Sequence, residues 1–162
     1  DADTAILERI ESPSISPETM DIISMAIRSR RIKGSALSSC VGEISDRDAL
    51  AQAADRLLAM EGVTTTLVCG FKEGTIHLSA RSRRTDLDLG ETLRQAFDDI
   101  GSAGGHTDMA GAQIPLGLFE ELTDEADSLA DLVDDRISER FFDALTVDAV
   151  RIAPEALPTS DE

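Results

Sequence analysis

The spacing of hydrophobic residues alternates along this chain between a helical pattern and an extended one. Hydrophobic residues three or four positions apart predict helices over residues 17–33, 45–61, 88–100 and 121–145. Ser16 followed by Pro17 marks the first helix start, because serine caps helices and proline suits their first turn. Asp88 can cap the third helix, and Ser45 with Asp48 resembles a capping box at the second.

The segments between these helices have the composition of β-strands. Runs rich in β-branched or alternating residues predict strands over 36–42, 63–71, 75–83 and 109–116. The short loop 72–74 joins two of them as an antiparallel hairpin. A hairpin within alternating helices and strands predicts an α/β fold: a mixed β-sheet with a central hairpin, flanked by helices and followed by a long C-terminal amphipathic helix.

The charge of the chain is its most unusual bulk property. Among 162 residues, 32 acids face 15 bases, only two of them lysine, and the net charge is −17. Such a charge destabilises a compact state unless salt screens it. We therefore expect a halophilic protein of a high-salt cytoplasm; an ordinary acidic soluble protein is the alternative. No apolar run reaches the length of a membrane span, so no membrane partner is expected.

Positive charge gathers in two short segments of this acidic chain. Strand alternation places His77, Ser79, Arg81 and Arg83 on one face of the 75–83 strand. That face is either an exposed edge or the wall of an anion site, where arginines bind phosphate oxygens in pairs. Residues 28–33 hold two possible secondary anion contacts, Arg28 and Arg31, although cations at a helix C-terminus are also favoured by the helix dipole.

A glycine-rich segment follows the third helix and is the second candidate for ligand contact. Gly104, Gly105 and His106 lie in it, and Gly111 follows five residues later. Backbone amides in such a loop can form an anion-binding nest, to which a histidine adds a donor. The alternative is a flexible turn with a surface histidine. We find no spacing typical of metal ligands and no nucleophile–base pair, so this chain is expected to hold no metal, cofactor or catalytic residue.

Two of these segments together resemble a known family. The strand sequence SARSR (79–83), the helix after Leu89 and the sequence GGHTDMAG (104–111) resemble the C-terminal DHH-associated domain of DHH-family phosphoesterases. That superfamily includes RecJ-like exonucleases, oligoribonuclease/phosphoadenosine-phosphate phosphatases and exopolyphosphatase-related proteins. The resemblance covers roughly residues 17–118.

The resemblance implies a domain organisation and a set of site residues. An N-terminal DHH domain would bind two divalent metals, usually manganese, and residues 1–16 would be the linker to it. Residues 17–150 would form the substrate-binding domain, and 151–162 a disordered acidic tail. Arg81 and Ser82 match the family's phosphate-binding strand. The substrate loop is matched by Gly104, Gly105 and His106, and the small residues after it include Gly111; Ala103 departs from the family's longer glycine run.

The resemblance also implies a function for the parent protein. It would be a cytoplasmic hydrolase acting on phosphorylated nucleotides or short single-stranded oligonucleotides, with this chain binding the substrate and being inactive alone. Its partners would be that nucleic acid and the DHH domain of the same protein. Two alternatives remain: a non-catalytic nucleic-acid-binding module, like the similar domain appended to alanyl-tRNA synthetases, and the polyphosphate-binding domain of an exopolyphosphatase-like enzyme.

Overall fold

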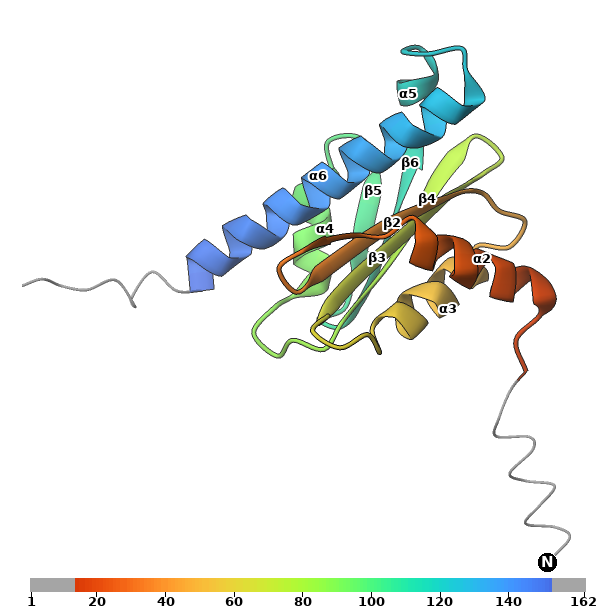
Figure 1. Ribbon diagram of the computed structural model, residues 1–162. Coiled ribbons are helices and arrows are strands. Elements are labelled where there is room, and N and C mark those ends of the chain that lie inside the picture. The colour runs from red at the N-terminus through yellow and green to blue at the C-terminus, as the bar shows by residue number, and fades with distance from the viewer. Residues whose placement is uncertain (1–13, 153–162) are drawn as a thin grey trace, which may run out of the picture.

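The computed structural model describes residues 14–152, which form one mixed sheet with helices on both faces (Figure 1). Most of the expected linker (1–16) and of the expected tail (151–162) lies outside these described residues. The elements in chain order are α2 (Pro17–Arg28), β1 (Arg31–Lys33), β2 (Ala36–Glu43), α3 (Asp48–Leu57), β3 (Thr65–Lys72), β4 (Thr75–Ser82), α4 (Leu89–Phe97), β5 (Ser102–Gly105), β6 (Met109–Pro115), α5 (Gly117–Glu120) and α6 (Ala126–Ile152).

The sheet confirms the predicted fold class. Its strands lie in the order β1-β2-β3-β4-β6-β5. Only β2 and β3 are parallel; every other neighbouring pair is antiparallel. The predicted hairpin is β3–β4, and it lies at the centre of the sheet.

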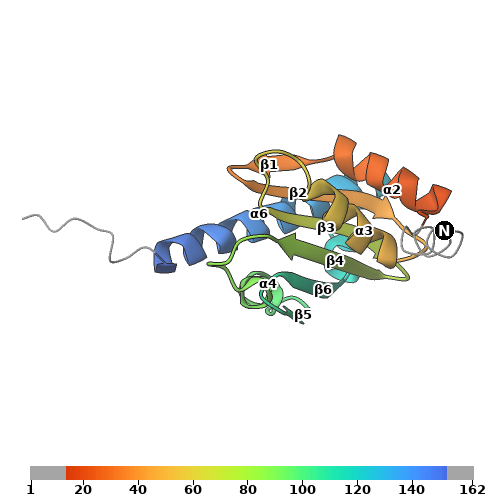
Figure 2. The same cartoon turned by 90° about the horizontal axis from the view of Figure 1, so that it is seen from below.

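Two hydrophobic clusters hold the helices against the two faces. On one face α2 and α3 cover β2 and β3, with Leu37, Val68 and Leu50 fully or almost fully buried between them. On the other face α4 and α6 cover the sheet over a larger cluster that includes Phe97 and Phe141. In Figure 2 neither α2 nor α3 extends over β6 or β5. The α3 side of these two strands is therefore left uncovered.

Buried hydroxyl groups in the strands fasten the helices to the sheet. Ser39 donates to the carbonyl of Ala26 in α2 at 2.7 Å, and Thr66 donates to the carbonyl of Ala54 in α3 at 2.9 Å. On the opposite face a hydrogen bond of 2.8 Å joins the hydroxyls of Ser38 and Ser138. Each buried hydroxyl is thus paired, which avoids the cost of an unsatisfied polar group.

The helix caps follow the sequence at two of three predicted sites. The side chains of Ser16 and Asp88 accept hydrogen bonds from backbone amides in the first turns of α2 and α4. The predicted capping box at Ser45 is wrong: α3 begins two residues later than expected, and the Ser45 hydroxyl instead donates to Glu18. Arg47 occupies the N-cap position and makes no side-chain cap there.

Two short strands replace segments expected to be helix or loop. Residues 31–33 form β1, so α2 ends at Arg28, which lies in its last turn, and Arg30 donates to the carbonyl of Ile27 at 2.6 Å. Residues 102–105 form β5 rather than an open loop. The expected helix over 121–145 begins later and extends further, as α6, and the short α5 precedes it. For the two short strands, pairing with a neighbouring strand overrides the local pattern.

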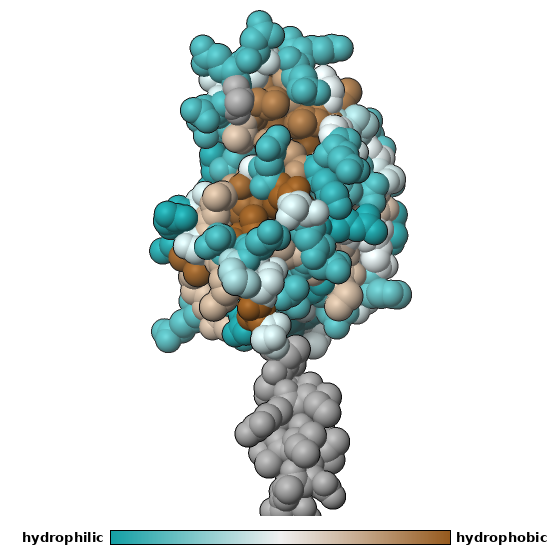
Figure 3. Space-filling model, turned by 90° about the vertical axis from the view of Figure 1, so that its right-hand side faces the viewer, coloured by the Kyte–Doolittle hydropathy of each residue, from teal (hydrophilic) through white to brown (hydrophobic). Residues whose placement is uncertain are grey.

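The surface reflects the acidic composition. On the face shown in Figure 3, hydrophilic side chains surround smaller hydrophobic areas near its middle. Within residues 14–152 no helix is long and apolar enough to cross a membrane. Cys40 and Cys69 are register partners on β2 and β3, and both are buried.

Candidate ligand-binding site

The uncovered face of β4, β6 and β5 is built from three rows of residues that run across the strands. In the first row, Gln113 pairs with both His77 and Ser102. Alternate residues of β4 are buried, which confirms that His77, Ser79 and Arg81 share this open face. The first row therefore carries only polar side chains.

The second row contains almost no side-chain atoms. Gly111 pairs with Ser79 on one side and Gly104 on the other. Two glycines and a serine leave the backbone of the sheet exposed at this level. Small residues in adjacent strands thus make a shallow floor on which a ligand can approach the main chain closely.

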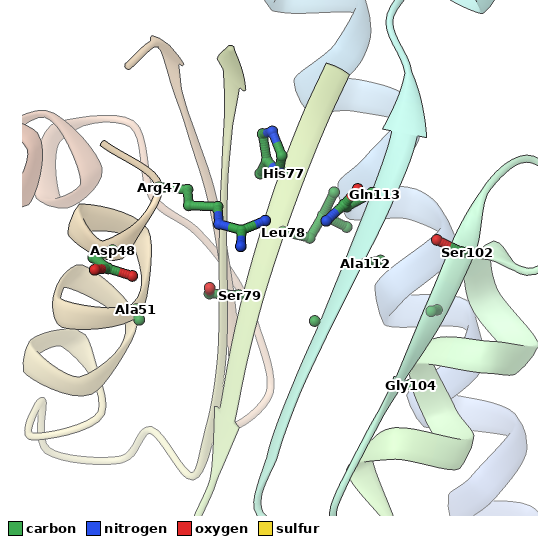
Figure 4. Close-up of a pocket in the computed structure, with 12 residues that line it drawn as sticks. Arg47, Asp48, Ala51, His77, Leu78, Ser79, Ser102, Gly104, Ala112 and Gln113 are labelled. Atoms are coloured by element: carbon green, nitrogen blue, oxygen red, sulfur yellow. The ribbon is translucent and has the colours of Figure 1, made fainter. Parts of the chain in front are cut away.

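This floor is the base of a cavity of about 360 Å³ between α3 and the sheet (Figure 4). The residues of the first two rows line it, and Arg47, Asp48 and Ala51 form the wall on the α3 side. In Figure 4 the side chain of Arg47 extends from the start of α3 toward β4, on which His77 lies. The cavity thus has a donor-rich end at the first row and a glycine floor at the second.

Among the lining residues that were not predicted as site residues, three can donate hydrogen bonds at the first row: Arg47, His77 and Gln113. Arg47 was expected within a helix, His77 was noted only as a member of a polar strand face, and Gln113 was not singled out. The sequence did indicate the position of His77, because strand alternation places it on the same face of β4 as Ser79 and Arg81. Arg47 and Gln113 come from other elements, and nothing in their local sequence connects them to that strand.

The His77 imidazole has a perturbed environment. Partial burial lowers the pKa of His77 below its usual 6.5, and the positive charges of Arg47 and Lys72 lower it further. Glu73 opposes this shift, and it is the only negative group among the causes of the shift. His77 is therefore predominantly neutral at pH 7 in the free protein.

Arg81, the principal predicted phosphate contact, faces the open side but does not line the cavity. Its Nε donates to Asp55 of α3 at 3.0 Å and its Nη1 donates to the carbonyl of Ala80 at 2.8 Å. The side chain is only 12% exposed. An anionic ligand at this end would compete with Asp55 for the Arg81 guanidinium.

Of the predicted loop residues, some line the cavity and others lie beyond it, at the β5–β6 turn. Gly104 lines the cavity, as does Gly111. His106 lies beyond them in the β5–β6 turn, where its amide donates to the carbonyl of Met109, the register partner of Arg81. Arg81 and His106 are thus brought to the same end of the sheet. Gly105 immediately precedes this turn.

The remaining predicted contacts lie elsewhere. Ser82 is buried on the opposite face of β4, where its hydroxyl shares a hydrogen bond with Thr65. Arg31 forms ion pairs with Asp134 and Asp135 of α6. Arg83 donates to the carbonyl of Val63, and Arg28 ends α2. None of these four residues lines the cavity.

The part of the chain that the structure describes, residues 14–152, contains no group of three or more His, Cys, Asp or Glu side chains that could hold a metal ion. The cavity offers cationic and neutral donors together with exposed backbone, and Asp48 is the one carboxylate in its lining. These groups suit a phosphate or another oxyanion, and they can orient such a group.

Comparisons with known proteins give the family. Residues 33–139 match the model of the DHHA1 domain. An uncharacterized protein of Methanocaldococcus jannaschii is 43% identical over 146 residues, which are 90% of this chain and 30% of that protein. This chain therefore spans less than a third of that relative.

Solved structures are also similar to this chain. An exopolyphosphatase-related protein from Bacteroides fragilis superposes with a TM-score of 0.54 and 9% identity, over 81% of this chain and 37% of that one. RecJ from Thermus thermophilus, in complex with Mg²⁺, gives a TM-score of 0.49 and 18% identity, over 74% of this chain and 18% of that one. The first of these shares the fold.

Proposed function

Because this chain belongs to the DHHA1 domain family, the domain associated with DHH-family phosphoesterases, we propose that it is the substrate-binding domain of a metal-dependent phosphoesterase. The resemblance noted in the segments 79–83 and 104–111 is thereby confirmed at the level of the family. The substrate proposed is a phosphorylated nucleotide or a short single-stranded oligonucleotide.

The observation that carries this proposal is the cavity on the uncovered face of β4, β6 and β5. In a chain of net charge −17 an anion is repelled from most of the surface, so an anion site needs a local excess of donors. The cavity supplies one through Arg47, His77 and Gln113, and its floor at Gly104 and Gly111 leaves backbone accessible.

The proposal gives the predicted loop and strand residues a role at the end of this floor. Arg81 and His106 lie at the same end of the sheet, next to the glycines. A phosphate there would compete with Asp55 for the Arg81 guanidinium and would accept a charged hydrogen bond from it. Arg81 is then held in place by Asp55 in the free protein and by the ligand in the complex.

Hydrolysis is assigned to another part of the parent protein. Residues 14–152 hold no cluster of metal ligands, so the proposal places the two divalent metals, manganese among the candidates, in an N-terminal DHH domain. Those metals would activate the attacking water and stabilise charge on the phosphate. The present chain would bind the substrate, orient its phosphate and limit access of water to it.

Calorimetric titration of a nucleoside 5′-monophosphate and a short oligonucleotide into the chain tests the proposal. Arg81→Ala should weaken binding by about 1.5–3 kcal/mol, the value of a hydrogen bond to a charged group. His106→Ala should weaken binding by less, and the two losses of binding free energy should not add, because both residues contact one phosphate.

Asp55→Ala should strengthen binding, because it removes the competitor for Arg81. Glu61 is exposed, so Glu61→Ala controls for the change in net charge.

Unchanged affinity in Arg81→Ala, together with unchanged affinity in Asp55→Ala, would remove Arg81 from the site. A chain that binds inorganic polyphosphate and neither nucleotide would favour the exopolyphosphatase-like alternative instead.

A further inference from the structure

Arg47 is an exposed cation that forms no ion pair among the described residues of this strongly acidic protein. Among residues 14–152, Arg47 takes part in none of the ion pairs or side-chain hydrogen bonds, although Asp48 follows it directly and lines the same wall. By contrast Arg31, Arg81 and Arg140 each pair with an aspartate. Arg47 instead extends into the cavity (Figure 4).

His77 lies close enough to Arg47 for their charges to interact. Arg47 and Lys72 act on His77 with the sign of like charges, and the single opposing contribution is that of Glu73. Gln113, the register partner of His77, adds an amide donor beside them, and Ser102 adds a hydroxyl. The carboxylate of Asp48 lines the same cavity but forms no ion pair with Arg47, so the guanidinium can bind an anion from outside.

This donor cluster is too far from the family's loop to serve the same phosphate group. The first row lies two residues along the strands from the glycine floor and four residues from the Arg81–Met109 row. At a rise of about 3.3 Å per residue these separations are roughly 7 and 13 Å. One phosphate therefore cannot contact both the first row and the Arg81–Met109 row.

We propose that Arg47, His77 and Gln113 form a second anion subsite, so that a nucleotide is held by two separate phosphate groups, one in the cavity and one at the Arg81 end of the sheet. This inference rests on the proposed function, since it assumes that a nucleotide occupies the cavity. The floor of Ser79, Gly111 and Gly104, with Ala51 opposite, lies between the two subsites and is free of large side chains. It leaves room for the sugar or base that connects the two phosphates.

The test compares a nucleoside 3′,5′-bisphosphate with the matching 5′-monophosphate by calorimetric titration into the 162-residue chain. The wild type should bind the bisphosphate more tightly. Arg47→Ala should weaken bisphosphate binding roughly 10-fold or more, the loss of one charge-assisted hydrogen bond, and should weaken monophosphate binding by a smaller factor. Arg56→Ala is the matched control, because Arg56 lies on the same helix, is exposed and does not line the cavity.

A second readout follows the His77 imidazole by NMR. An anion at this subsite should raise the pKa of His77, since it offsets the charges of Arg47 and Lys72. The bisphosphate should therefore shift the His77 titration upward, and the monophosphate should do so less. The chain has two histidines, so a His77→Gln variant assigns the signal.

The outcomes separate this inference from the proposal on which it rests. If the wild type binds neither nucleotide, the proposed function fails and the second subsite fails with it. If both nucleotides bind with equal affinity, or if Arg47→Ala and Arg56→Ala lose the same affinity, the second subsite alone is wrong. Inorganic tripolyphosphate, tested in parallel, shows whether anionic groups suffice or whether the nucleoside between them contributes.

Discussion

At the scale of single residues, two neighbouring glycines in the site are required for different reasons. Gly105 has a φ of 150°, and an added Cβ would lie 2.5 Å from the Cα of Ala110 and 2.5 Å from the carbonyl oxygen of Met109. The nearest atom to a Cβ on Gly104 is instead the Nη1 of Arg94, at 3.3 Å, the end of a flexible side chain. The backbone therefore demands glycine at 105, whereas the fold itself tolerates a methyl group at 104.

Substitution by alanine should separate these two roles. Gly105→Ala should lower the free energy of unfolding by about 1–3 kcal/mol, because it combines backbone strain with a steric clash. Gly104→Ala should change it by less than about 0.5 kcal/mol but should weaken nucleotide binding, because a methyl group enters the cavity floor. Urea unfolding and calorimetric titration of both variants measure these effects. Equal losses of stability would show that the two positions are both structural.

At the scale of elements, α6 belongs to the domain along most of its length, including the part beyond the family match at residue 139. Val133, Ile137 and Phe141 are fully buried against the sheet and α4. Polar contacts fix the helix as well, since Asp134 pairs with Arg31 of β1. The helix therefore completes the core on this face and is not an appended tail.

Truncation of buried and exposed residues on α6 tests this conclusion. Phe141→Ala should lower the free energy of unfolding by about 3–5 kcal/mol, the usual cost of removing a buried aromatic side chain. Val147→Ala is the control on the same helix, because Val147 is 46% exposed, and it should change stability by less than about 0.5 kcal/mol. Urea unfolding followed by circular dichroism measures both. A small loss for Phe141→Ala would mean that α6 does not pack in solution as described.

At the scale of the whole molecule, the net charge of −17 acts on every element at once. The ion pairs that the structure shows are few and mostly exposed, so they contribute little against this repulsion. The Debye length falls from about 10 Å at 0.1 M salt to about 3 Å at 1 M, which removes most of the repulsion between separated carboxylates.

The melting temperature should therefore rise steeply between dilute buffer and molar KCl. A variant with Asp127→Asn, Asp131→Asn and Asp143→Asn removes three exposed negative charges from α6 and should depend less on salt. Differential scanning calorimetry of both proteins across KCl concentrations makes the comparison. A melting temperature that is flat with salt, or equally steep in both proteins, would contradict adaptation to a salty cytoplasm.

The sequence by itself determined the features that depend on neighbouring residues. The alternation of β4, the caps at Ser16 and Asp88 and the β3–β4 hairpin are set by contacts within a few positions, so local patterns predict them. The family was also readable from two short segments, because the strand 79–83 and the sequence 104–111 are each contiguous.

Only the tertiary structure decided how these features assemble into a site. Strand β5 contains two glycines and has little intrinsic preference for a strand; it forms because β6 offers an unpaired edge. Arg81 is held by Asp55, 26 positions away, and Arg47 meets His77 and Gln113 from three separate elements. Such contacts depend on the order of the strands in the sheet and on the position of α3 relative to β4 and β6. These long-range relations leave no periodic signal in the sequence, so the predicted phosphate contacts and the actual lining of the cavity overlap only at the glycines.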